Sequence, residues 1–166
     1  MNSSDPMENS INSTTSDLIY VGFWKRFSAS LIDYIIVLCI TLPILMFYYG
    51  ESYWTNDDLL EGPFDFFLSF VFPAVATIWF WVAKQATPGK MAIHAKIIDA
   101  KTGMAPTTGQ YIGRYFGYVL STLPLGLGYI WIAFDPKNQG WHDKLAGTVV
   151  VAPKVVERKE VSFEGN

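Results

Sequence analysis

Charged side chains are scarce in this chain of 166 residues, and their scarcity argues against a water-soluble globule. Charged residues make up 16% of the sequence, whereas apolar residues make up 51% and aromatic residues 16%. A soluble domain carries about 25% charged residues, so this chain has too few water-facing side chains to cover one. The net charge is only −3, and no run of lysine or arginine suggests a nucleic-acid partner.

The chain has a single cysteine, and its first residues lack the pattern of a signal peptide. Cys39 is the only cysteine and lies within an apolar run, so no intramolecular disulfide can form. Residues 1–17 are rich in Ser, Asn and Thr and contain no basic segment followed by an apolar one. We expect a disordered cytoplasmic tail there, because so polar a segment cannot bury enough surface to fold.

What the chain does have is long apolar segments, at residues 27–49, 66–83 and 110–134. The first contains 23 residues, which reach about 35 Å as a helix and therefore cross a hydrocarbon core of about 30 Å. Pro43 is expected to kink this helix, and a membrane helix tolerates such a break. Trp79 and Trp81 near the end of the second segment suit an interfacial aromatic belt.

The distribution of lysine and arginine predicts which side each loop occupies. Lys25 and Arg26 precede the first span and four lysines follow the second, whereas the linker 50–65 contains five acids and no basic residue. The N-terminus and the loop after residue 83 are therefore expected inside, and the linker outside. Lysines also follow the third region, which leaves two alternatives: a plain third span with a basic tail outside, or a re-entrant helical hairpin turning at Pro124–Gly128. We favour the hairpin.

A small β element is predicted on the cytoplasmic side. Residues 91–97 alternate in the period of a strand, and residues 148–152 form the only other β-branched run outside the spans. Pairing between them requires both segments on one side of the membrane, as the hairpin alternative provides. Thr87-Pro88-Gly89-Lys90 is interpreted as a turn, since it lacks the remaining residues of a phosphate-binding loop.

Asp33 is the sharpest chemical feature, because a carboxylate seven residues into a span must face a protein interior or water. Arg26 lies two helical turns earlier on nearly the same face, about 10 Å away and too far for direct pairing. Arg114 near the third region is a candidate partner. A structural network and a proton or cation site remain equally open for Asp33.

Two further patterns favour structural explanations. Gly109, Gly113, Gly117 and Ser121 are spaced by four and predict close helix packing beside Arg114. Asp135, His142, Asp143, His94 and Asp99 match no compact ligand motif, so we predict neither a metal site nor a cofactor. No nucleophile–base pattern is present, and an enzyme is not expected.

Several motifs, taken in order, make the chain resemble the RDD family of membrane proteins, named for one arginine and two aspartates. The first is the run Gly22-Phe23-Trp24-Lys25-Arg26-Phe27-Ser28-Ala29-Ser30-Leu31-Ile32-Asp33. The others are Thr87-Pro88-Gly89-Lys90, Leu123-Pro124-Leu125-Gly126-Leu127-Gly128, Phe134-Asp135-Pro136 and His142-Asp143-Lys144-Leu145-Ala146-Gly147-Thr148. The resemblance assigns Arg26 as the arginine, Asp33 as the first aspartate and Asp143, with Asp135 as its rival, as the second. It implies a family often suspected of transport, with sodium/proton exchange proposed for some members.

The sequence therefore predicts an all-α integral membrane protein of the RDD type at residues 18–152, with two full spans, a broken third hairpin and a small cytoplasmic β element. Residues 153–166 are expected to form a charged cytoplasmic tail. One functional hypothesis is a multi-pass transporter in a bacterial inner membrane, such as a monovalent cation/proton antiporter, with a homo-oligomer or other membrane proteins as partners. The alternative is a non-transporting assembly or regulatory subunit.

Overall fold

Two long apolar helices form the axis of the computed structural model, which describes residues 18–51, 53 and 60–154. Helix α2 spans Phe23–Tyr49, and a second helical segment spans Pro63–Lys84; both are long and apolar enough to cross a membrane. The two predicted spans are thus confirmed as candidate membrane helices, each a few residues longer at its start. The tail predictions for 1–17 and for most of 153–166 lie outside the described residues.

The two prolines affect these helices differently. Helix α2 continues without interruption across Pro43. The second segment consists of α4 (Pro63–Phe66), a π-helical turn η1 (Phe67–Val71) and α5 (Phe72–Lys84). The π-helical turn is wider than an α-helical turn and ends two residues before Pro73. In a regular α-helix the ring of Pro73 would clash with the carbonyl one turn earlier.

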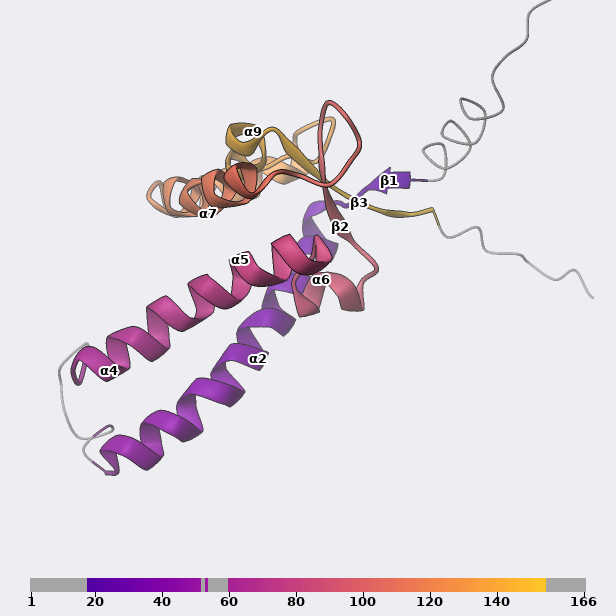
Figure 1. Ribbon diagram of the computed structural model, residues 1–166. Coiled ribbons are helices and arrows are strands. Elements are labelled where there is room, and N and C mark those ends of the chain that lie inside the picture. Colours follow the sequence, from indigo (N-terminus) through magenta and orange to yellow (C-terminus); the bar gives the residue numbers. More distant parts are fainter. Residues whose placement is uncertain (1–17, 52, 54–59, 155–166) are drawn as a thin grey trace, which may run out of the picture.

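A three-stranded antiparallel sheet lies at the end of the molecule where α2 begins (Figure 1). Its order is β1 (Leu18–Tyr20), β3 (Thr148–Pro153) and β2 (Lys96–Asp99). The predicted pairing is confirmed, with Ile97 opposite Val150. The predicted start of the strand is wrong, because residues 91 and 92 end the short helix α6 (Pro88–Ala92). Pro88 occupies the first turn of α6, where its fixed φ favours a helix over a simple turn.

The core lies between the sheet and the end of α5. Trp81 is 0% exposed and packs with Val21, Ile97 and Val150 in one apolar cluster. Trp79, two residues earlier and therefore on nearly the opposite side of the helix, is 61% exposed. The interfacial position predicted for both tryptophans is therefore wrong for Trp81.

The third apolar region consists of helical segments joined at a sharp bend, and it is called the hairpin below. Helix α7 (Thr108–Thr122) begins with a capping box between Thr107 and Gln110 and is followed by α8 (Leu127–Ile130) and the 3-10 turn η2 (Trp131–Ala133). The two halves are bent by 113°. The break predicted at Pro124–Gly128 is present, whereas the position of this region relative to a membrane stays a prediction.

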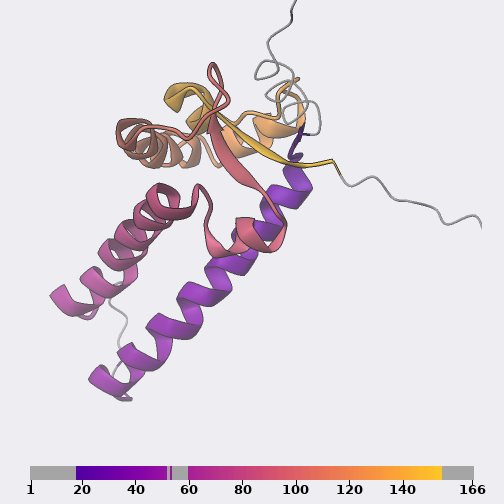
Figure 2. The ribbon, with the colours of Figure 1, turned by 45° about the vertical axis from the view of Figure 1, so that its right-hand side comes forward.

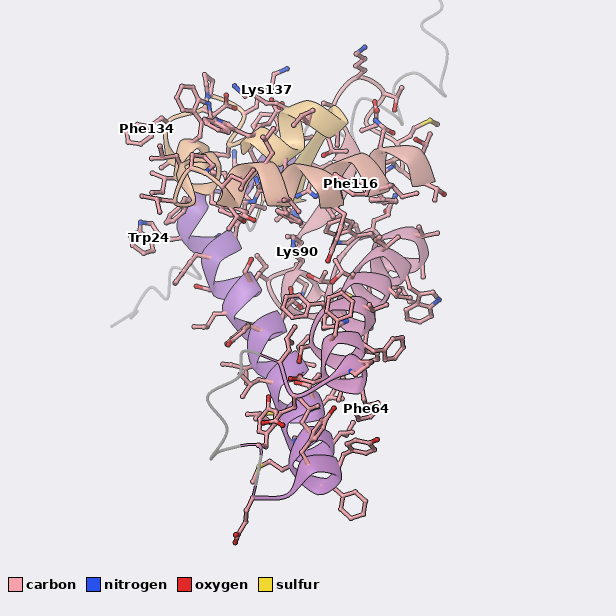
Figure 3. All side chains as sticks on the ribbon, turned by 90° about the vertical axis from the view of Figure 1, so that its left-hand side faces the viewer. Trp24, Phe64, Lys90, Phe116, Phe134 and Lys137 are labelled. Atoms are coloured by element: carbon pink, nitrogen blue, oxygen red, sulfur yellow. The ribbon has the colours of Figure 1, made fainter. Side chains whose placement is uncertain are left out.

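The remaining elements gather at one end of the long helices. Helix α6 packs against α2, and α9 (Trp141–Ala146) packs against α7. In Figure 2 the sheet, α7 and α9 form a layer from which α2 and α5 extend away, and α6 lies beside α2 just outside this layer. Figure 3 shows that α7 runs across the direction of these two helices. This layer brings the charged residues of α2, α7 and α9 together.

Candidate functional site: a buried charge cluster beside a cavity

Asp143 joins three helices through its carboxylate. Arg26 Nη2 of α2 donates to Asp143 Oδ2 at 2.6 Å, and Arg114 Nη1 of α7 forms an ion pair with Oδ1. The three side chains are 6%, 0% and 0% exposed for Arg26, Arg114 and Asp143. Burial alone would raise the pKa of the Asp143 carboxyl, but the two guanidinium groups hold it well below its usual range. Asp143 is therefore ionised at neutral pH.

The first turn of α9 positions the Asp143 carboxylate for its contacts with the two arginines. Asp143 Oδ2 accepts the backbone N–H of Gly140, the residue before α9, at 2.9 Å. A carboxylate at this position satisfies one of the free N–H groups of the first helical turn. Arg26 also donates from Nη1 to the carbonyl of Asn138 at 2.6 Å, which ties the loop before α9 to α2.

Close packing of α7 on α9 depends on Gly117. A Cβ at this position would lie 2.7 Å from His142 Cα, so no larger residue fits without movement. Ser121, one turn later, is fully buried. Gly113 has open space around its missing side chain and Gly109 meets only its neighbour Thr107. The predicted close contact is therefore present at Gly117 and Ser121 and wrong for the two earlier glycines, since a spacing of four drifts around the helix.

His142 is neutral and its tautomer follows from its partners. Burial lowers the pKa of this imidazole well below its usual value. Nε2 lies 3.2 Å from Arg26 Nη2, and a guanidinium can only donate, so Nε2 is the acceptor. Nδ1 consequently bears the proton and donates to Ser121 Oγ at 3.3 Å, while that hydroxyl donates to the carbonyl of Gly117.

Asp33 is held by α6 and by no arginine. Its Oδ2 accepts from Thr87 Oγ1 at 2.5 Å and its Oδ1 accepts from the N–H of Gly89 at 2.6 Å. A Cβ on Gly89 would lie 1.9 Å from the carbonyl oxygen of Ala29, so α6 rests directly on α2. The expected pairing of Asp33 with Arg114 is wrong. Across the described part of the chain, Asp33 takes part in no salt bridge.

A cavity of about 560 Å³ lies between α2, α5 and the hairpin. It is lined both by the ion-paired cluster, through Arg26, and by Asp33. Asp33, Arg26 and His142 line it, together with aromatic and aliphatic side chains of α2, α5 and the hairpin. Lys90 also lines it and is only 5% exposed. Its Nζ has Thr87 Oγ1 as a neighbour at 3.5 Å, so a single hydroxyl links Lys90 to Asp33. Burial lowers the pKa of Lys90.

Two of the five predicted site residues, Arg26 and Asp33, line this cavity, and two more contact Arg26 or its partner directly behind it. Arg26, Arg114 and Asp143 form the ion-paired cluster, and Asp33 lines the same cavity as Arg26. Asp135 lies apart: it pairs with Lys144 Nζ at 2.5 Å and accepts two backbone N–H groups of its own loop.

Lys90 and Thr87 were missed by sequence reasoning. A lysine after Pro-Gly in a polar segment is typical of an exposed turn, and nothing in the local pattern indicates that α6 buries it against α2. His142 was considered only as a metal ligand. His142 Nε2 does lie 3.4 Å from Asp143 Oδ2, but the other residues of that set lie elsewhere. Asp99, for example, accepts from Gln110 and from the turn after β2.

Comparison with known proteins places the chain in a family. The model of the RDD family matches residues 20–147. This protein belongs to the RDD family. The uncharacterized protein RP437 of Rickettsia prowazekii is 29% identical over 171 residues, covering 81% of this chain and 96% of the relative. No solved structure matches the chain.

Two Bacillus subtilis proteins are also similar to this RDD protein. The uncharacterized protein YxaI is 33% identical over 146 residues, covering 78% of this chain and 95% of the relative. The uncharacterized membrane protein YteJ is 28% identical over 161 residues, covering 84% and 85%. The RDD assignment and the two apolar helices agree in making this a membrane protein. In it, Arg26 contacts Asp143 rather than Asp135.

Proposed function

We propose that this RDD protein is a multi-pass membrane transporter that exchanges a monovalent cation for a proton, with Asp33 binding the two in turn. One observation carries the proposal. Asp33 lies in a helix long and apolar enough to cross a membrane, lines the cavity, and is hydrogen-bonded to a hydroxyl and a backbone N–H rather than paired with a cationic side chain. Its negative charge is thus available to an ion, and ionisable groups inside a membrane commonly mark ion pathways.

The charges around the cavity favour a one-for-one exchange. Arg26 and Arg114 contribute two positive charges, and Asp143 and Asp33 two negative ones. Lys90 lines the same cavity, and burial lowers its pKa. Because like charges repel strongly in a medium of low polarity, the carboxylate of Asp33 accepts one further positive charge, a proton or a monovalent cation, more readily than both together.

The membrane placement is part of the proposal. Lys25 lies in the first turn of α2, Lys84 in the last turn of α5 and Lys96 in β2. With Lys137, which lies at the same end of the molecule (Figure 3), they support a cytoplasmic position for that end and for the N-terminus. The Rickettsia and Bacillus relatives support a bacterial cell membrane. Two long helices enclose too little space for a complete pathway, so we expect a homo-oligomer or another membrane protein to complete it.

Proton movement in everted membrane vesicles tests this proposal. A pH-sensitive dye would report proton flux on adding sodium or potassium, for wild type, Asp33→Asn and the control Asp135→Asn, whose carboxylate lies away from the cavity. We expect a cation-dependent signal from wild type and the control and none from Asp33→Asn. A wild-type signal no larger than that of vesicles lacking the protein would exclude the proposal.

A second function has its own support. The ion pairs of Asp143 with Arg26 and Arg114 hold α2, α7 and α9 together, as expected for a non-transporting assembly subunit with structural charges. In that case Asp33→Asn lowers the protein level or the melting temperature in detergent, and affinity purification recovers a stable partner. A well-folded Asp33→Asn variant that lacks only ion flux would refute this second function.

A further inference from the structure

Helix α7 carries a row of large apolar side chains that no other described residue covers. The row, called the apolar stripe here, consists of Ile112, Phe116, Val119 and Leu123, which are 42%, 68%, 55% and 74% exposed. Spacings of three and four residues place them on one face of the helix. The opposite face, with Arg114 and Ser121, is buried against the protein.

The exposed apolar surface continues past the bend. It is extended by Leu125, Leu127, Ile130, Trp131 and Phe134, which are 97%, 53%, 46%, 46% and 77% exposed. A continuous apolar surface of this extent marks an interaction site rather than a face in contact with water. The question is what covers it.

The direction and length of α7 select its partner. Its 15 residues reach about 22 Å, less than the roughly 30 Å of a hydrocarbon core. Figure 3 shows α7 running across the long helices rather than along them. If α2 and α5 cross the membrane, α7 is parallel to its surface. In the same view Lys137 points away from the long helices, toward the expected aqueous side.

We propose that the hairpin of residues 108–134 lies flat in the headgroup region of one leaflet, with its apolar stripe in contact with phospholipid acyl chains. It then neither crosses the membrane nor re-enters it. An amphipathic helix with one apolar face and one polar face is suited to this boundary. Trp24 and Phe134 project from the same flank of the molecule, on α2 and beside the hairpin, as aromatic anchors do at an interface (Figure 3).

The proposed position has a consequence for the cavity. Tyr118 of α7, Tyr129 of α8 and Ile132 of η2 line it from the hairpin side. The hairpin therefore covers the cavity at the boundary between lipid and water. This inference rests on the membrane placement of α2 and α5 given in the proposed function, but it does not depend on ion exchange.

Spin-label depth measurements in reconstituted phospholipid vesicles test the placement. In a Cys39→Ser background, single cysteines would replace Phe116, Leu123 and Leu125, with Ile36→Cys in the middle of α2 as the deep reference and Lys137→Cys as the aqueous one. Collision with oxygen and with a water-soluble nickel chelate gives the depth of each label. We expect all three hairpin labels at a shallow depth between the two references.

Each other outcome overturns the proposal. A label at Leu125 as deep as Ile36→Cys would show re-entry, and reaction of Lys137→Cys with an impermeant reagent from the side of the 50–65 linker would show a full crossing. Labels as water-accessible as Lys137→Cys would show that the stripe faces water. Labels shielded from both reagents would show that it is a protein interface. Ile112→Cys and Val119→Cys read the same stripe if one of the first variants fails to fold.

Discussion

At the scale of single residues, Asp143 is the countercharge for two buried arginines. Replacing it with asparagine would leave Arg26 and Arg114 buried, close together and without an ion-pair partner. Breaking a buried pair in this way costs about 3–5 kcal/mol, so we predict that Asp143→Asn lowers the free energy of unfolding by that amount. Denaturant or thermal unfolding of the purified protein in detergent measures the loss.

The control for this prediction is Asp135→Asn. Asp135 pairs with Lys144, whose side chain is 45% exposed, and such a pair contributes only about 0–1 kcal/mol. The Asp143 variant should therefore be much less stable than the Asp135 variant. Equal losses would show that the buried cluster is not what holds the three helices together.

His142 makes stability depend on pH. Its pKa is lowered well below 6.5 by burial, so below about pH 6.5 the unfolded chain binds a proton that the folded protein does not. Stability is therefore predicted to fall as the pH decreases from 7.5 to 5.5. Melting temperatures across this range, for wild type and His142→Gln, test the prediction. A wild-type melting temperature that rises on acidification, or a slope unchanged in the variant, would contradict it.

Site residues could be predicted only where their type stands out from the surrounding sequence. Asp33 and Arg26 stand out because charge is rare in an apolar run, and they do line one cavity. Lys90 gives no such signal, since its burial arises when Gly89 allows α6 to rest on α2. The partners of Asp33 were missed for the same reason: the contact joins residues more than fifty positions apart.

At the scale of elements, two glycines of α7 form a matched pair. Gly117 meets His142 with no space for a Cβ, whereas Gly113 faces open space. Gly117→Ala is predicted to destabilise the protein by about 1–3 kcal/mol through overpacking. Gly113→Ala is predicted to stabilise it by up to about 1 kcal/mol, because alanine favours the helix. Unfolding in detergent measures both, and changes of the same sign would contradict the packing described.

The helices and strands follow from patterns of different strength. Apolar runs of membrane-spanning length predicted α2 and the segment ending with α5, and the cluster of Pro124, Gly126 and Gly128 predicted the bend between α7 and α8. The pairing of β2 with β3 was also predictable from β-branched residues. The first half of the predicted strand failed because Pro88 starts a helix, and β1 is only three residues long, too short for its alternation to be recognised.

At the scale of the whole molecule, charge and lipid-facing surface are separated. The long helices are mostly exposed and apolar, whereas Arg26, Arg114 and Asp143 meet at the end where α2 begins. The sidedness drawn from the lysine and arginine counts stays a prediction. Those counts could not indicate that Arg26, Arg114 and Asp143 meet, because the three residues are far apart along the chain.

Cation-driven proton flux, measured together with the melting temperature of the same preparations, tests the central claim most directly. The account predicts that wild-type vesicles respond to sodium or potassium and that Asp33→Asn loses the response while its melting temperature stays near that of wild type. An Asp33→Asn protein that keeps both fold and flux would contradict the assignment of Asp33 as the exchanging carboxylate.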